Sequence, residues 1–411
     1  MIEESAADDG TPGRLAAGAL LTLGGVGYGC LLFVWFSLPA YLSPVIDDLG
    51  LTGLQAGVLA GAVPLTYIPL GLASGLLIDR IGARRGIAAG VVLAGVGQFG
   101  RAFAPEFWSM LALTLVLGVG ATGLTFGLPK LAAELYPTDR VGRAATVYLI
   151  GSSAGSAAAF GLGRPLIGPA LGGWRPLFVA SGLTTLVVAV GWIVAARYVP
   201  AGRYETDDAT FTRAALVADL RAVFSSHGLR LLVAVGTMYL LISHGIQGWL
   251  VTILEARGFD SGLAGTVTSL LVVAHVIALL VVPVVAERLE RRSETLIVCP
   301  ALAFVGLLAL LVELPWTPLV VVPVALIGFG LGGLSPLIRA IPVELDDVGP
   351  ALTGTAVGLV FAIGEIGGFL GPVFVGSLQD ATGSFAPGIA VLALGAIVAA
   401  AAGAAMPDVD G

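Results

Sequence analysis

Charged residues are scarce in this chain. Lysine, arginine, aspartate and glutamate make up 11% of the 411 residues, and lysine occurs once, as Lys130. Soluble globular proteins carry about 25% charged residues, which they need to cover their surface. With 57% hydrophobic residues and a mean hydropathy of +0.98, the composition excludes a soluble globular protein.

Cysteine and histidine are also rare, and their positions exclude several kinds of site. The two cysteines, Cys30 and Cys299, lie inside apolar runs and form neither a disulfide framework nor a metal site. The three histidines have no metal-binding spacing, and no stretch resembles a nucleotide-binding loop. We therefore expect no metal, no cofactor, no ATP drive and no nucleic-acid partner. Since no catalytic residues cluster, we expect no enzyme.

The chain is built from apolar runs of about 20 residues, the length that spans a bilayer as a helix. Only helices and closed barrels satisfy the backbone in lipid, and continuously apolar runs exclude the alternation of a barrel. The pattern predicts an all-α integral membrane protein with twelve transmembrane helices. They are expected near residues 16–43, 53–78, 86–104, 107–134, 143–166, 176–197, 229–254, 262–286, 294–313, 317–340, 350–374 and 385–405.

These helices are expected to form two pseudo-symmetric six-helix bundles, at 14–200 and 229–406, joined by a polar cytoplasmic linker at 201–228. Residues 1–13 and 407–411 are expected to be cytoplasmic tails, the first of them disordered, with an uncleaved first helix. The halves echo each other, because helix 2 ends in "IDRIGARRG" and helix 8 in "AERLERRSE". A repeated bundle with a site between its halves is typical of secondary transporters.

The positive charges predict the orientation. Sixteen of the 20 lysines and arginines lie on the side of the N-terminus, and four, Arg101, Arg164, Arg175 and Arg257, lie on the other side. Positive residues are enriched in cytoplasmic loops. We therefore expect a multi-pass protein of the cell membrane with both termini in the cytoplasm.

One loop carries a motif. "GLLIDRIGARRG" resembles the signature that the major facilitator superfamily carries between helices 2 and 3, with Gly75, Leu77, Asp79, Arg80 and Gly82 in the matching positions. Ala83 departs from the pattern, which expects a basic residue there. Together with the twelve helices and the central linker, the resemblance covers the whole chain and implies the major facilitator fold.

The resemblance implies a charge network at the inner face that holds the two halves together. It would consist of Asp79, Arg80, Arg84 and Glu134. Asp79, at the end of helix 2, would contact the start of helix 11, whose partial positive charge suits a carboxylate. The alternative is that these arginines only fix topology.

Within the superfamily, "TFGLPKLAAELYPTDR" and "GGWRPLF" look like the branch of cyanate, nitrate and related small-solute permeases. The resemblance implies that nitrate transporters of this branch carry a membrane-embedded arginine in helices 2 and 8, which neutralises the anion. Neither helix has such an arginine here, so nitrate itself is disfavoured. "GPALGG", Gly168 to Gly173, resembles the core of an antiporter signature, although Arg164 stands where that signature has glycine.

Ionisable residues inside membrane spans are costly, so each is a candidate for function. Glu365, in the middle of helix 11, is the candidate proton carrier, because burial disfavours its charged form. The alternative is a structural carboxyl group at a helix contact. His244 is a candidate for both proton coupling and substrate binding. The alternative is a core histidine whose imidazole is hydrogen-bonded to a neighbouring carbonyl group. His275 is a lesser candidate.

The remaining substrate-binding candidates are aromatic, amide or basic side chains in spans: Trp35, Lys130, Tyr148, Tyr239, Gln247 and Arg339. Lys130 and Arg339 are pseudo-equivalent in helices 4 and 10, where snorkelling or latch contacts are the alternative. Ser152 is a lesser candidate. Tyr41 is expected to be an interfacial anchor, and Arg101 and Arg164 are expected to form salt bridges at the outer rim.

The sequence therefore predicts a monomeric secondary active transporter that moves a small solute, with small anions as one class, by alternating access and proton coupling. The alternative within transport is a proton-driven drug or metabolite efflux antiporter. A membrane sensor would normally bring a soluble domain, which the polar segments are too short to form.

Overall fold

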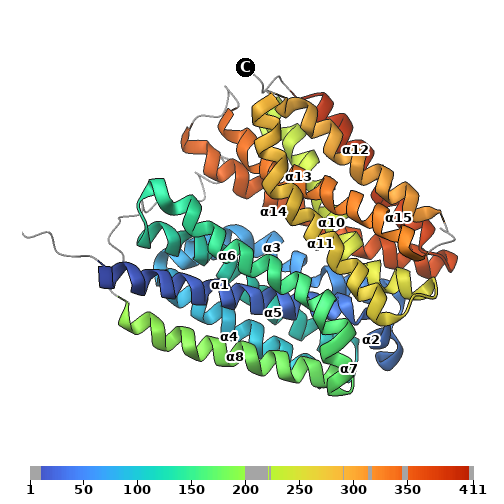
Figure 1. Ribbon diagram of the computed structural model, residues 1–411, viewed down its shortest axis with the longest axis horizontal. Coiled ribbons are helices and arrows are strands. Elements are labelled where there is room, and N and C mark those ends of the chain that lie inside the picture. The colour runs from blue at the N-terminus through green and yellow to red at the C-terminus, as the bar shows by residue number, and fades with distance from the viewer. Residues whose placement is uncertain are drawn as a thin grey trace, which may run out of the picture.

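A computed structural model describes residues 11–199, 221, 224–289, 291–312, 317–344 and 350–406, and these are almost entirely helical (Figure 1). The helices of the N-terminal half are α1 (Thr11–Ala40), α2 (Leu42–Leu49), α3 (Gly53–Ile81), α4 (Ala83–Arg101), α5 (Phe107–Leu135), α6 (Thr138–Ala158), the π-helix η1 (Ala159–Ile167), α7 (Gly168–Leu171) and α8 (Trp174–Tyr198). Those of the C-terminal half are α10 (His227–Ala256), α11 (Ser261–Leu289), α12 (Arg292–Leu311), the 3-10 helix η2 (Thr317–Val320), α13 (Val321–Glu344), α14 (Pro350–Thr382) and α15 (Ala386–Ala404).

Within the described residues, eleven helices are long and apolar enough to cross a membrane. The twelfth is α4, whose ends carry Arg84, Arg85 and Arg101 and so lower its hydropathy. With 19 residues it is about 28 Å long at the usual helical rise, and it packs between α5 and α8. The predicted all-helical fold of two six-helix bundles is confirmed. The predicted tails and most of the linker lie outside the described residues, so the domain boundaries stay a prediction.

Several helix ends differ from the prediction for local reasons. The first helix breaks at Tyr41, shortly after Pro39, and the chain continues as the short α2. The fifth predicted helix runs beyond 166, because the π-helix η1 accommodates Pro165 and leads into α7. The eleventh extends to Thr382, where Gly383 adopts a left-handed conformation with φ of +70° and ends it.

The two halves meet mainly where α3 packs along α14 and where η1 packs against α11. On α3, Gly53, Gly57 and Gly61 face the backbone of α14, and a Cβ at Gly57 would lie 2.5 Å from the carbonyl oxygen of Pro372. Small residues of this kind let membrane helices approach closely.

Figure 1 shows the halves together at one end, which holds α2 and α7, and diverging at the other. We call the first the α2 end. The second is the linker end, where α8 finishes and α10 begins.

Candidate solute-binding site

A cavity of about 210 Å³ lies between the two halves. Helices α1 and α6 line it from the N-terminal half, and α10 and α11 line it from the C-terminal half. Six of the residues singled out in the sequence line this cavity: Trp35, Ser152, Tyr239, His244, Gln247 and His275. The fold therefore brings candidates from four helices to one place.

Trp35 connects the two halves at this cavity. Its indole ring is nearly parallel to the imidazole of His244, with an interplanar angle of 7° and ring centroids 5.7 Å apart. Phe36 and Tyr67 stack with the same indole at 5.4 and 6.3 Å. Because Trp35 belongs to α1 and His244 to α10, movement of one half against the other must change this stack.

Glu365 on α14 lies beside His244, with Oε2 3.8 Å from the imidazole Nε2. The side chain is buried, and Oε2 has no hydrogen-bond partner among the described residues. A charged carboxylate in such a place is costly, so the neutral acid is favoured until solute or water reaches it. A carboxyl group next to an imidazole can hold and pass a proton.

Lys130 and Arg339, the pseudo-equivalent bases, have different partners. Lys130 on α5 forms an ion pair with Asp79 at 2.5 Å, which places it with the predicted charge network. Arg339 on α13 donates from Nη1 to the carbonyl and hydroxyl oxygens of Ser335 at 2.9 and 2.7 Å, and its guanidinium lies 4.4 Å from the ring centroid of Phe361. No carboxylate of a described residue pairs with Arg339.

Tyrosines of the N-terminal half form a cluster around Thr125 and Tyr28. Tyr148 on α6 packs against Tyr28 on α1, with ring centroids 6.3 Å apart. The hydroxyl groups of Tyr28 and Tyr67 both bond to Thr125 Oγ1, at 3.3 and 2.8 Å. Tyr148 therefore lies near the cavity but not among the residues that line it.

Three residues of the network predicted at the linker end, Asp79, Arg84 and Glu134, interact with other groups of the N-terminal half, and the network itself stays a prediction. Asp79 pairs with Lys130, and Glu134 lies within electrostatic range of Lys130 and Arg84. Arg84 donates to the carbonyl oxygens of Ala196 and Val199 at the end of α8, at 3.2 and 2.7 Å. The predicted contact of Asp79 with the start of helix 11 involves residues 345–356, whose side chains lie outside the described residues.

At the α2 end, polar contacts join the halves directly. Arg164 on η1 forms an ion pair with Glu255 on α10, so the salt bridge expected for Arg164 is present. Ser43 donates to the same carboxylate at 2.5 Å. Asp380, near the end of α14, accepts hydrogen bonds from the backbone N–H groups of Gly53 and Leu54, both at 2.7 Å. It thereby caps the N-terminus of α3, where negative charge is favoured.

Sequence reasoning missed Glu255 and Asp380. Both stand near the ends of predicted helices, where acidic residues are ordinary, so their types and positions carry no signal of a partner. Their roles depend on which helix of the other half lies opposite.

Two expectations for this end are wrong. Arg101 forms no rim salt bridge, because its side chain is fully buried, bonds to Gln98 and the Val34 carbonyl, and lies 5.1 Å from the ring centroid of Phe178. Tyr41 is no interfacial anchor, because it is 2% exposed and donates to the Gly163 carbonyl at 2.8 Å. Burial raises the pKa of Tyr41, so its hydroxyl remains a donor.

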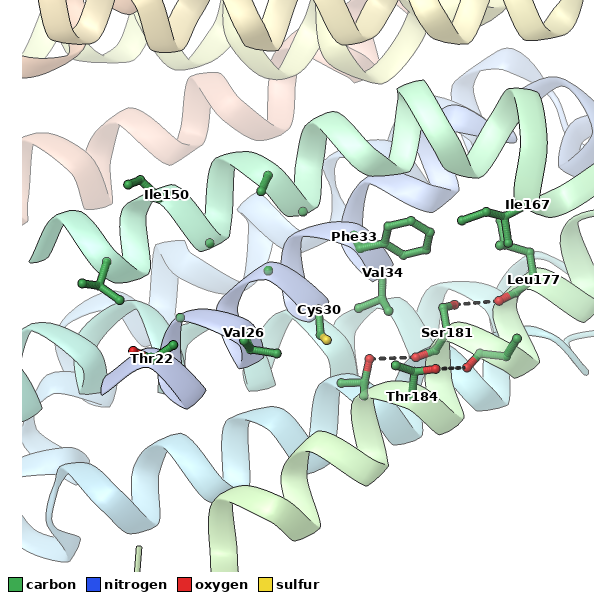
Figure 2. A pocket seen from close by; sticks show the side chains of 18 residues that line it. Thr22, Val26, Cys30, Phe33, Val34, Ile150, Ile167, Leu177, Ser181 and Thr184 are labelled. Atoms are coloured by element: carbon green, nitrogen blue, oxygen red, sulfur yellow. Dashed lines mark hydrogen bonds between the residues drawn. The ribbon is translucent and has the colours of Figure 1, made fainter. Parts of the chain in front are cut away.

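A larger cavity of about 730 Å³ lies between α1, α6 and α8 (Figure 2). Most of its walls are apolar, and the lone sulfur on it is that of Cys30. The hydroxyl groups of Thr22, Ser181 and Thr184 are bonded to backbone carbonyls one turn away. Because its polar atoms are already satisfied, this cavity suits acyl chains better than a polar solute.

Comparisons with known proteins agree with this architecture. The family model of the Major Facilitator Superfamily matches residues 24–372. An uncharacterized transporter of Bacillus subtilis, YycB, is 26% identical and 91% of each chain is covered. A putative tartrate transporter of Agrobacterium vitis is 24% identical, with 84% of this chain and 82% of the relative covered. A quinolone resistance transporter of Acinetobacter baumannii is 25% identical, with 84% and 83% covered.

Two solved structures share the fold. A bacterial homolog of the human lysosomal transporter Spinster, in an inward-facing and unoccupied conformation, has a TM-score of 0.73 at 18% identity and covers 96% of this chain and 94% of its own. A point mutant of the nucleoside transporter NupG has a TM-score of 0.78 at 16% identity and covers 95% and 100%.

Proposed function

Since the chain belongs to the Major Facilitator Superfamily, we propose that it is a proton-coupled secondary active transporter that moves a small organic solute by alternating access. The observation that carries this proposal is the Glu365–His244 pair behind a cavity shared by both halves. No covalent chemistry is required of the protein, because binding and proton transfer suffice to couple two gradients.

Alternating access is supported by the asymmetry between the two ends. The α2 end is held by Arg164, Glu255, Ser43 and Asp380 across the interface. At the linker end the helices of the two halves diverge. Closing the linker end while breaking the α2 contacts would present the same cavity to the opposite side of the membrane.

The orientation is part of the proposal. The excess of positive charge at the linker end supports a cytoplasmic location for that end and for both termini. The protein would then be a monomer in the cell membrane, open toward the cytoplasm in the conformation described above.

Two substrate classes have support. The relative named for tartrate favours organic acids, and the likeness to cyanate and nitrate permeases favours smaller anions. The second candidate function is proton-driven drug efflux, supported by the relative named for quinolone resistance. In both, Glu365 carries the proton.

The test is solute-driven proton movement in proteoliposomes that contain a trapped pH dye. Tartrate, benzoate, nitrate, cyanate and a quinolone are added in turn to wild type, Glu365→Gln and the control Glu294→Gln, whose carboxylate is 59% exposed on α12. We expect at least one solute to move protons with wild type and the control, and none with Glu365→Gln. Equal proton movement by Glu365→Gln would overturn the assignment.

A further inference from the structure

We propose that Arg339 recognises the carboxylate of the transported solute, and that the substrates are therefore small organic acids in their anionic form. The inference rests on the proposed transport function and deepens it by naming the substrate class. It comes from a break in the symmetry of the two halves around Arg339.

The two halves place a base and an acid in corresponding positions but pair them differently. In the N-terminal half, Lys130 on α5 is neutralised by Asp79 at the end of α3. The corresponding pair in the C-terminal half would be Arg339 on α13 and Glu287 near the end of α11. Glu287 instead lies 4.0 Å from Arg292 and its side chain is 73% exposed. The charge of Arg339 is thus left without a carboxylate among the described residues.

Arg339 acts electrostatically on groups of both halves. Its charge lies within electrostatic range of Tyr28 and Tyr148 in the N-terminal half and of Tyr239 and His275 in the C-terminal half. Tyr239 and His275 also line the central cavity. A single cation that reaches groups on both sides of the interface is well placed to bind a solute shared by them.

The local contacts fix the orientation of the Arg339 guanidinium in a way that suits binding of a carboxylate. Both hydrogen bonds to Ser335 use Nη1, and one face lies over Phe361. Ser335 and Phe361 therefore hold the group in place, while the edge formed by Nε and Nη2 has no hydrogen-bond partner among the residues that the structure describes. Two parallel N–H donors on one edge match the two oxygens of a carboxylate.

The surroundings favour an organic monoanion over other anions. Arg339 offers one positive charge, and no lysine or arginine lines the central cavity as the structure describes it. Aromatic rings of Trp35, Tyr148 and Tyr239 suit a planar carbon body. A bare inorganic anion would leave these rings without a partner.

The test is equilibrium binding to the purified full-length protein in detergent, without any gradient. Benzoate, lactate and succinate monomethyl ester are compared with benzamide and lactamide, and with nitrate, by the shift that each causes in thermal unfolding. We expect at least one carboxylate to stabilise wild type and its amide to have no effect. Arg339→Gln should abolish this shift, and Arg339→Lys should weaken affinity at least tenfold, because lysine lacks the two-donor edge.

Arg143→Gln, an exposed arginine on α6, is the matched control and should bind as wild type does. Equal binding of an acid and its amide, binding of nitrate alone, no binding of any carboxylate, or unchanged binding by Arg339→Gln would each overturn the inference. Because this assay needs no proton gradient, Glu365→Gln should still bind carboxylate. Failure of proton coupling and failure of anion recognition are therefore distinguishable.

Discussion

The guanidinium of Arg164 and the carboxylate of Glu255 form an ion pair between η1 and α10, across the α2 end of the interface. The two side chains are only 13% and 15% exposed, so water screens them poorly. Tyr41 lies below the guanidinium, with its ring centroid 4.6 Å from Arg164 Cζ. The pair is a charged link between the halves at this end, and it would have to break for the α2 end to open as proposed.

We predict that Glu255→Gln shifts the protein toward an open α2 end. Removing one partner of a poorly exposed ion pair costs about 3 kcal/mol, which is enough to reverse a two-state population of ten to one. Spin labels at Trp108 and Leu319, which are 68% and 46% exposed on opposite halves, report the separation. We expect a longer distance in Glu255→Gln than in wild type.

The exchange of the two charges is the control. The double variant Arg164→Glu, Glu255→Arg restores an ion pair with opposite polarity and should return the label distance toward the wild-type value. If the single and double variants give the same distance as wild type, the pair does not hold this end closed.

At the linker end, we predict opposite effects from the two partners of the Asp79–Lys130 pair. Lys130→Gln leaves Asp79 without its partner and available to the start of α14, which favours a closed linker end. Asp79→Asn removes the acceptor and favours an open end. Labels at Tyr198 and Leu289, 81% and 60% exposed, should move closer in the first variant and apart in the second. Shifts of the same sign would indicate a merely structural pair.

The fold could be predicted because hydropathy reports directly on membrane spans. Glu365 was also visible in the sequence, since a carboxyl group in the middle of an apolar run has few ordinary explanations. What the sequence could not give is the rotation of each helix about its axis. In a membrane the lipid-facing side is as apolar as the core, so no amphipathic pattern indicates which face of α10 or α14 turns inward.

Side-chain partners depend on that rotation, which is why the pairings were less predictable than the helices. Glu365 and His244 are 121 residues apart, and their approach to 3.8 Å follows from the packing of α10 against α14. Lys130 and Arg339 looked equivalent in sequence and have different partners. Arg101 lies at a predicted helix end, yet it is turned into the core of its half, where Gln98 and a backbone carbonyl bond to it.

We predict that Gly57→Leu prevents the close contact between α3 and α14. The added side chain would meet the Pro372 backbone, which cannot give way as a flexible side chain can. Overpacking of this kind destabilises by about 1–3 kcal/mol. Thermal unfolding in detergent should show the loss, whereas Gly191→Leu, at an exposed position on α8 with open space around it, should unfold as wild type does. A wild-type melting temperature for Gly57→Leu would contradict the close packing.

Trp35 provides the sharpest test of the central cavity, because it is both a wall of the cavity and a neighbour of His244 in the proposed proton site. Trp35→Leu removes the stack with His244, whose aromatic component contributes about 0.5–1.5 kcal/mol. We expect the solute concentration for half-maximal proton movement to rise roughly 2- to 13-fold by the same estimate, with Trp35→Phe closer to wild type because it keeps a ring. Trp108→Leu, at an exposed tryptophan, serves as the control. If Trp35→Leu and Trp108→Leu both behave like wild type, the solute does not pass through this cavity, and the site must be sought nearer to Arg339 at the linker end.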